Sequence, residues 1–176
     1  MTNNELFTLM RSIVMLVTGV PACILADQNT SAPSGPYATI RPRQSVRQYG
    51  QAGIKYTGIP DDKVRHTIKL QKMCDCSINF YRGSAQEYAE LIAECNKRPD
   101  VQELLMRASV GWNGADAVNN LTSLQANNWE QRAQVTVRLM YEIEQIVDTN
   151  AVTNVGVSTQ IESGDVVQVV DVTVNP

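Results

Sequence analysis

Four cysteines are the most reactive side chains of this sequence, and their spacing limits what they can do. They are Cys23, Cys74, Cys76 and Cys95. Cys74 and Cys76 stand two apart in a strand pattern, so their α-carbons would lie ~6.6 Å apart with parallel side chains, a poor geometry for a disulfide. A Cys-x-Cys pair with distant cysteines and the single His66 also lacks the paired spacing of a zinc site. We expect buried, reduced thiols and no metal.

Catalysis would need a nucleophile with a base in reach, and the sequence offers no such pair. His66 lies on the apolar side of a strand pattern, which favours a packed, neutral imidazole. Glu142 and Glu144 share one face of another strand, where paired carboxylates could hold a metal or move protons. A solvated or subunit-facing strand explains them better. Nucleotide-binding glycine loops and His-Glu-x-x-His motifs are absent from the sequence. We expect no enzyme and no cofactor.

The composition fits a single domain, residues 1–176, with an aliphatic core. Hydrophobic residues make up 43% of the chain and aromatic residues only 6%, so Val, Ile, Leu, Ala and Met must fill the interior. The net charge of −3 is unlike the basic balance of a nucleic-acid binder. Arg41, Arg43 and Arg47 form a local basic cluster that suits a solvated or interface strand. We expect no sequence-specific contact with nucleic acid.

The amino-terminal segment predicts an amphipathic helix. Asn3 or Asn4 can cap it, and Glu5 in the first turn suits the positive end of the helix dipole. Gly19 is placed to end the helix, and Pro21 prevents it from resuming. One broad apolar face follows from spacings of three and four residues, with Leu6, Leu9, Met10, Ile13, Leu16 and Val17.

A secretory leader ending in a lipoprotein-type Cys23 is the alternative for this segment. Glu5 makes its start acidic, and Pro21 stands where small, flexible residues precede a cleavage site. No apolar run approaches the ~20 residues that cross a bilayer. We expect no membrane association, and the alternative function is a secreted or lipoprotein-type binding module without enzymatic activity.

Two long alternating segments predict strands of unusual length. The seventeen residues 64–80 would span ~56 Å as a strand, beyond the usual length, so part of it should pair with or point toward a neighbouring subunit. Lys72 and Met73 break the alternation, which predicts a bulge or a change of environment there. Residues 130–147 form the second long strand. Residues 152–174 predict a valine-rich hairpin with its turn at 162–165.

Shorter elements complete the pattern. Residues 37–49 predict a strand with an edge or bulge at Pro42, followed by a mobile hairpin or projecting loop. Ser84 and Glu87 form a capping-box pattern at the start of a helix, and Pro99 suits the first turn of another. Residues 110–114 predict a short strand that ends in an Asn-Gly turn. The fold class is α+β: an antiparallel or mixed sheet with long strands, covered by helices on one face.

The segment 27–41 joins the first helix to the sheet. Its polar first half contains Pro33, Gly35 and Pro36, which restrict the backbone, and Tyr37 begins the alternation of a strand. The order of apolar helix, Gly-Val-Pro, Gln28-Asn29, a proline-containing spacer and Gly-Pro-Tyr-Ala-Thr-Ile resembles neck and tail terminator proteins of tailed bacteriophages.

The resemblance implies a structural virion protein of the neck or tail end, assembled in the host cytoplasm. Such proteins form closed rings, typically hexamers, that cap the tail tube and join it to the head connector, with the sheath as a further partner in a contractile tail. The loop either only routes helix to sheet or takes part in a subunit or tail-tube contact. The residues expected at that contact are Gln28, Asn29, Pro33, Gly35, Pro36 and Tyr37.

Overall fold

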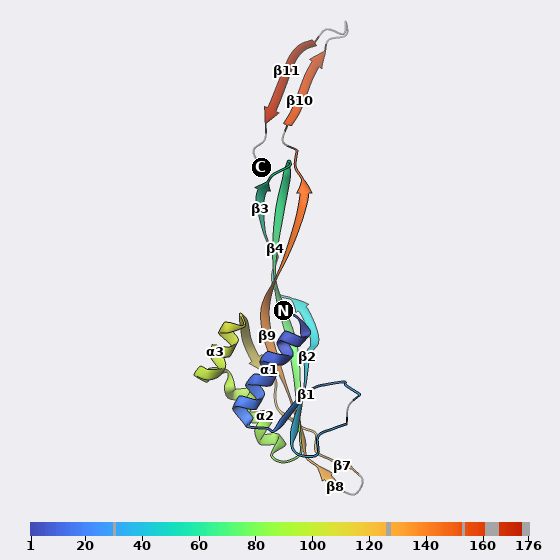
Figure 1. Cartoon of the computed structure of the whole chain (residues 1–176), viewed down its shortest axis with the longest axis vertical. Coiled ribbons are helices and arrows are strands. Elements are labelled where there is room, and N and C mark those ends of the chain that lie inside the picture. Colours follow the sequence, from blue (N-terminus) through green and yellow to red (C-terminus); the bar gives the residue numbers. More distant parts are fainter. Residues whose placement is uncertain (30, 126–127, 153, 161–165, 174–176) are drawn as a thin grey trace. The chain divides into compact units, whose positions relative to one another are not determined.

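The computed structural model of the chain describes residues 1–29, 31–125, 128–152, 154–160 and 166–173 (Figure 1). Contacts within the chain divide it into two compact units. Unit 1 comprises Met1–Gly50 and Gln71–Ile143, and unit 2 comprises Gln51–Leu70 and Glu144–Pro176. That residues 1–176 act as one domain stays a prediction. The helices and longer strands are α1 (Asn3–Thr18), β1 (Ala22–Leu25), β2 (Tyr37–Gln48), β3 (Gly53–Ile59), β4 (Lys63–Tyr81), α2 (Ala85–Glu94), α3 (Pro99–Arg107), β5 (Val110–Ala115), β9 (Arg132–Asn150), β10 (Asn154–Gln160) and β11 (Val166–Thr173).

The main sheet has seven strands in the order β1-β2-β4-β9-β5, with β3 also paired to β4 and the short β6 (Asn119–Asn120) to β9. β1 runs parallel to β2, whereas β2 and β3 pair antiparallel with β4, and β5 and β6 with β9. Two further antiparallel pairs are β7 (Ser123–Gln125) with β8 (Asn128–Glu130), and β10 with β11. This is the mixed α+β architecture that the sequence predicts.

The core lies in unit 1, between one face of the sheet and the three α-helices, which cover the same side (Figure 1). Alternate residues of the two longest strands supply the sheet side of this core, because side chains two apart on a strand share a face. The fully buried side chains of this layer are Cys76, Ile78, Phe80, Ala133, Val135, Val137 and Leu139. The prediction that helices cover one face is confirmed.

Helix α1 begins one residue earlier than the sequence suggests. Thr2, rather than Asn3 or Asn4, is the cap: its Oγ1 accepts from the Glu5 backbone N–H at 3.2 Å, and the Glu5 carboxylate accepts from the Thr2 N–H at 2.6 Å. The helix ends at Gly19, whose φ of 67° suits a residue without a Cβ.

The buried face of α1 differs from the predicted one by a small rotation. Val14 is buried, whereas Leu16 is 48% exposed and Val17 only partly buried. The sequence prediction includes Leu16 and Val17 in the buried face and leaves Val14 out of it. The fully buried members of the face are Leu6, Met10, Ile13 and Val14.

Two local motifs are corrected by the structure. Ser84 is the residue before α2, but its side chain makes no capping hydrogen bond, so the predicted capping box does not form. Asn113-Gly114 does not turn the chain: β5 continues to Ala115, and the register with β9 slips between Trp112 and Ala115. Gly114 has a φ of 92°, which marks a bulge rather than a turn. Pro99 does start α3 as predicted.

The bulge near Pro42 is confirmed, and the one expected at Lys72 and Met73 is not found in the pairing with β2. The register between β2 and β4 shifts between Arg41 and Ser45. Lys72 and Met73 face Gln48 and Arg47 in regular order. The broken alternation of β4 instead coincides with a change in burial, since most residues from Met73 onward are buried and none before it is.

Unit 2 contains strands without a core of their own. The segment expected as a mobile hairpin or loop is strand β3, joined to β4 by a turn in which Asp61 and Asp62 have φ of 67° and 51°. β10 and β11 form the predicted closing hairpin, and its predicted turn at 162–165 lies outside the described residues. Every described side chain of unit 2 is exposed or only partly buried.

All four cysteines are free, and all are buried in unit 1, which confirms their predicted burial. Burial raises the pKa of Cys23 to about 12 and those of Cys74 and Cys95 to about 11. It raises the pKa of Cys76 as well. The thiolates are therefore scarce at neutral pH, and thiolates are the reactive form.

The rotated face of α1 predicts unequal costs for two leucines of the same helix. Leu6→Ala should lower the free energy of unfolding by ~2–5 kcal/mol, because it leaves a cavity in the core. Leu16→Ala should lower it by about 1 kcal/mol or less, because the side chain is half exposed. Urea denaturation of both variants measures this difference, and equal losses would contradict the observed face.

The buried thiols predict slow modification of the folded chain. At pH 7 and at pH 9 a maleimide should label the folded protein slowly, because the raised pKa values keep the thiols protonated across this range. An exposed cysteine with a pKa near ~8.5 would instead react much faster at the higher pH. Intact mass after labelling, with and without denaturant, gives the readout. All four thiols should react on unfolding, and rapid labelling of any thiol in the folded chain would be the contrary result.

Candidate assembly surfaces

The structure separates the residues predicted for the interface loop into two places. Gln28 is exposed and lines a hollow of about 320 Å³ with Phe7, Thr8 and Arg11 of α1 and three residues of β1. Asn29 is also exposed. Pro33, Gly35 and Pro36 are half-buried, and Tyr37 is buried at the start of β2. The first part of the loop thus lies beside α1, and the second part leads into the sheet.

Arg82 anchors the second part of the loop. Its Nη1 donates to the backbone carbonyls of Pro33 and Ser34 at 2.7 and 3.0 Å, and its Nε donates to Glu130 Oε1 at 3.1 Å. The same guanidinium lies 5.7 Å from the centroid of the Tyr37 ring. We call these five residues the Arg82 clamp. Because one planar cation contacts the loop, β2 and β8 together, it fixes the path of a segment that has little regular structure.

The backbone at the clamp is tightly constrained. Arg82 itself has a φ of 63°, and its N–H donates to the Gln131 carbonyl at 2.8 Å. Gly83 follows with a φ of 58°, and a Cβ built there would lie 3.1 Å from the Pro36 side chain. Pro36 therefore packs against a position where only glycine fits comfortably.

Two tyrosines stack at the start of β2 and the end of β4. The rings of Tyr37 and Tyr81 lie 4.6 Å apart and 7° from parallel, and the Arg132 guanidinium lies 5.1 Å from the Tyr81 ring. Burial, and secondarily the nearby Tyr81 phenol, raise the pKa of Tyr37. Arg132 also donates to Asn79 Oδ1 at 3.1 Å. Two arginines thus contact the aromatic pair, Arg82 at the Tyr37 ring and Arg132 at the Tyr81 ring.

The sheet face of unit 1 opposite the helices is polar, and we call it the polar face. Arg41 donates two hydrogen bonds to the Asp27 carboxylate at 2.8 and 2.7 Å, which hold the pKa of Asp27 below its ordinary value. Gln134 donates to Ser77 at 2.9 Å. A hollow of about 250 Å³ on this face is lined by Ala26, Asp27, Thr39, Arg41, Ser77, Asn79, Tyr81, Arg132 and Gln134.

Other arginines of the polar face form ion pairs with aspartates. Arg138 pairs with Asp116 and lies 4.0 Å from Asp75, and Arg47 lies 3.5 Å from Asp75. Charges that cancel in this way leave a hydrogen-bonding surface rather than a strongly cationic one. The face suits contact with another protein surface better than binding to a polyanion.

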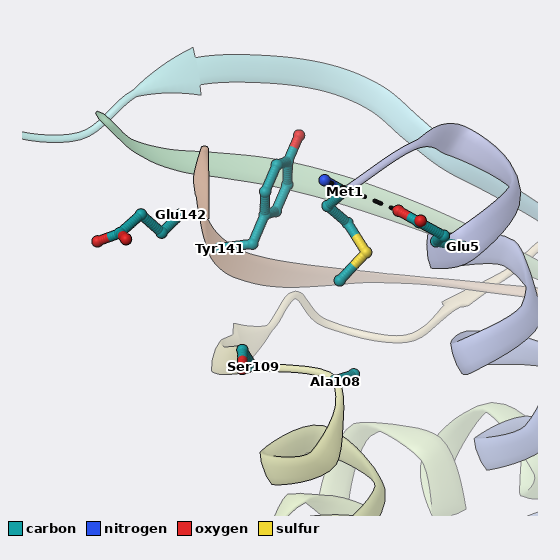
Figure 2. A pocket seen from close by; sticks show the side chains of 6 residues that line it. All are labelled: Met1, Glu5, Ala108, Ser109, Tyr141 and Glu142. Atoms are coloured by element: carbon teal, nitrogen blue, oxygen red, sulfur yellow. Dashed lines mark ion pairs between the residues drawn. The ribbon is translucent and has the colours of Figure 1, made fainter. Parts of the chain in front are cut away.

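A third hollow, of about 490 Å³, lies where the start of α1 meets β9 and the turn after α3 (Figure 2). The Met1 ammonium is 3.7 Å from the Glu5 carboxylate, and the Tyr141 ring stands beside Met1 while Glu142 points away from it. Arg43 lies 5.5 Å from the Tyr141 ring centroid, and burial raises the pKa of Tyr141. Ser109 also lines this hollow, and among the described residues no histidine or lysine stands beside it there.

The side chains considered for chemistry each have a structural partner. His66 Nε2 lies 2.8 Å from Thr149 Oγ1, and its ring meets Tyr56 edge-on at 4.9 Å. Glu142 accepts from Gln71 at 3.0 Å, and Glu144 lies 3.6 Å from Lys69 Nζ. Among the described residues, no group of three acidic, histidine or cysteine side chains could hold a metal ion. In the same part of the chain, no helix is both long and apolar enough to span a bilayer.

Sequence reasoning missed the residues that hold the loop and line the polar face. Arg82, Glu130 and Arg132 stand at the ends of strands, where the sequence shows only isolated charges. The available signal was the polar half of each strand alternation: residues 75, 77, 79 and 81 of β4, and 132, 134, 136 and 138 of β9. The alternation gives each strand a polar side, but it does not reveal the pairing of β4 with β9 that joins the two sides into one face.

Among the described residues, the α+β fold carries a charge-paired polar sheet face and an anchored loop, with no assembled catalytic group. A family model described as phage neck terminator protein matches residues 4–165. No curated protein matches the chain. The chain belongs to the phage neck terminator family, so it is a structural component of the virion neck that associates with other virion parts. The resemblance seen in the sequence is confirmed.

The Arg82 clamp predicts a local effect of its removal. Arg82→Ala should lower the free energy of unfolding by ~1–2 kcal/mol, because two backbone carbonyls and Glu130 lose a charged donor. Proteolysis within residues 28–36 should also become faster, since the loop loses its anchor. Arg107→Ala is the matched control, because among the described residues Arg107 pairs with Glu103 alone, on the exposed side of α3. Equal cleavage of both variants would rule out an anchoring role for Arg82.

Proposed function

We propose that this neck terminator forms a closed homo-oligomeric ring, a hexamer, that caps the tail tube and joins it to the head connector. The proposal rests on the unburied apolar side chains of unit 2. It contains paired strands with many apolar side chains, yet its described residues include no buried one. Apolar surface of this kind is stable in water only when another surface covers it. Membership of the neck terminator family supports other virion proteins as the cover for that surface.

A ring needs two different surfaces on each subunit, because a heterologous contact repeats around an axis until it closes. The chain offers surfaces of distinct character: the charge-matched polar face of unit 1 and the apolar strands of unit 2. The loop with Gln28, Asn29, Pro33, Gly35, Pro36 and Tyr37 is the proposed site of a further contact, with a neighbouring subunit or with the tail tube. Its anchoring by Arg82 supports such a role, since a fixed loop loses little entropy on binding.

The proposed partners are further copies of the chain, the tail tube protein, the head–tail connector and, in a contractile tail, the sheath. The net charge of −3 and the paired arginines of the polar face support the absence of sequence-specific DNA binding. Free, buried thiols suit assembly in the reducing cytoplasm of the host. A lipoprotein role finds no comparable support, because acylation of Cys23 would remove a buried residue from β1.

Ring formation predicts a defined oligomer and a specific role for Pro36. Native mass spectrometry of the purified chain, alone or with tail tube protein, should show a hexamer.

Pro36→Ala should reduce the ring fraction more than it lowers the melting temperature, because the loop gains freedom while the core is unchanged. The two quantities are compared at matched protein concentration. A persistent monomer under both conditions contradicts the ring, and equal loss of ring and stability makes the loop only a connector.

A further inference from the structure

One arginine of the polar face has no acid as a partner. The Arg132 guanidinium donates to Asn79 Oδ1 at 3.1 Å and lies 5.1 Å from the Tyr81 ring, and its Nε is buried without a hydrogen-bond partner among the described residues. Glu130, two residues before it, already pairs with Arg82. Arg132 is therefore a partly buried cation without a counter-ion, which is costly because water solvates its charge incompletely.

The hollow of about 250 Å³ beside Arg132 carries one positive charge in excess, and we call it the Arg132 hollow. Two guanidinium groups, those of Arg41 and Arg132, and one carboxylate, that of Asp27, line it. Asp27 is occupied by its two hydrogen bonds from Arg41, at 2.8 and 2.7 Å. The lining thus leaves the charge of Arg132 for a ligand with a single negative charge.

The neutral side chains of the Arg132 hollow add hydrogen-bond donors. Ser77 Oγ accepts from Gln134 Nε2 at 2.9 Å and keeps its own O–H to donate. Asn79 accepts from Arg132 through its oxygen and keeps its NH₂ group to donate. An ionised carboxylate fits this lining, because it only accepts hydrogen bonds and carries one charge. A phosphate group, at about −1.5 to −2 near pH 7, exceeds the one charge available.

The size and position of the Arg132 hollow favour an acidic side chain of another molecule. Its 250 Å³ is below the roughly 300–1,000 Å³ of small-molecule sites, which favours a single side chain over a cofactor. The helices of the same chain lie on the other side of the sheet, beyond the core, so their acids cannot reach the polar face (Figure 1). Asp75 and Asp116 of the polar face pair with Arg47 and Arg138.

Helix α2 presents acids on the opposite side of unit 1. Glu87, Glu90 and Glu94 are exposed, and spacings of three and four residues place them along one face of the helix. We call these three residues the α2 row. In the part of the chain that the structure describes, none of them forms an ion pair, and Glu90 accepts a hydrogen bond from Gln86 at 2.8 Å. The acids of α3, in contrast, pair with arginines.

We propose that a glutamate of the α2 row in one copy enters the Arg132 hollow of the next copy and pairs with Arg132, as a heterologous contact of the ring. The inference rests on the proposed ring and names this contact. The α2 row and the Arg132 hollow lie on opposite sides of one sheet, so the contact runs in one direction from copy to copy until it closes. Two α2 rows would repel each other, which disfavours a two-fold dimer through this surface.

Charge reversal and rescue test the contact. At a concentration where half of the wild-type chain is in rings, Arg132→Glu should lower the ring fraction about tenfold or more, because repulsion replaces attraction at every contact. Glu87→Arg, Glu90→Arg and Glu94→Arg are then each combined with Arg132→Glu. One of these combinations should return the ring fraction to near the wild-type value. Native mass spectrometry measures the ring fraction, and the melting temperature of each variant shows whether it folds.

The matched control combines Glu103→Arg with Arg132→Glu. Glu103 is exposed on α3, outside the α2 row, so its reversal should restore nothing. If Arg132→Glu fails to fold, the three reversals of the α2 row are measured as single changes. At least one should then lower the ring fraction about tenfold at an unchanged melting temperature, and three wild-type results would overturn the contact.

The contrary results separate the contact from the ring. If folded Arg132→Glu assembles like the wild type, the contact is wrong and the ring proposal stands. A loss of rings that no member of the α2 row restores, or that Glu103→Arg restores equally well, also overturns the contact and assigns the Arg132 hollow to a different acidic partner. If the wild-type chain forms no ring, alone or with tail tube protein, both proposals fail.

Discussion

The structure depends on the alternation of side chains along two nineteen-residue strands, β4 and β9. In unit 1 one set of alternate residues is buried under three helices, and each large apolar side chain there contributes roughly 1.5–3 kcal/mol through burial. The same strands continue into unit 2, where the corresponding apolar residues are exposed or only partly buried and no described residue is buried. One pattern thus meets two environments, one completed within the chain and one that, in the proposed ring, another molecule completes.

The chain path around the sheet depends on a few cations at strand ends. Arg82 follows β4 and holds the loop before β2, while Arg132 opens β9 and lies over the Tyr81 ring. Each of these two arginines contacts carbonyl oxygens, a side-chain amide or an aromatic ring. Each therefore links segments that are far apart in sequence. In a neck protein that associates with other virion parts, such contacts keep an irregular loop in one conformation and lower the entropy lost on assembly.

The periodicity of apolar residues predicts the long elements. The shorter ones depend on pairing between strands, which the sequence does not show. The long strands, the helix with its Gly19 end and the closing hairpin all follow from local patterns. β1 does not, because its four residues follow Pro21 directly and are a strand only through parallel pairing with β2. The same holds for the Asn113-Gly114 bulge, which depends on the register with β9. Arg82 was missed because its partners lie 48 residues or more away in sequence, and no spacing within one segment reveals such a contact.

Hydrogen exchange on the free and assembled chain tests most directly whether unit 2 is completed by other copies. Amides of β3, β10 and β11 should exchange rapidly in the dilute monomer and become protected in the assembled ring, while residues 73–81 and 133–141 should be protected in both. Equal protection of unit 2 in monomer and ring would contradict the account, because it would mean that these strands are already stable without a neighbour.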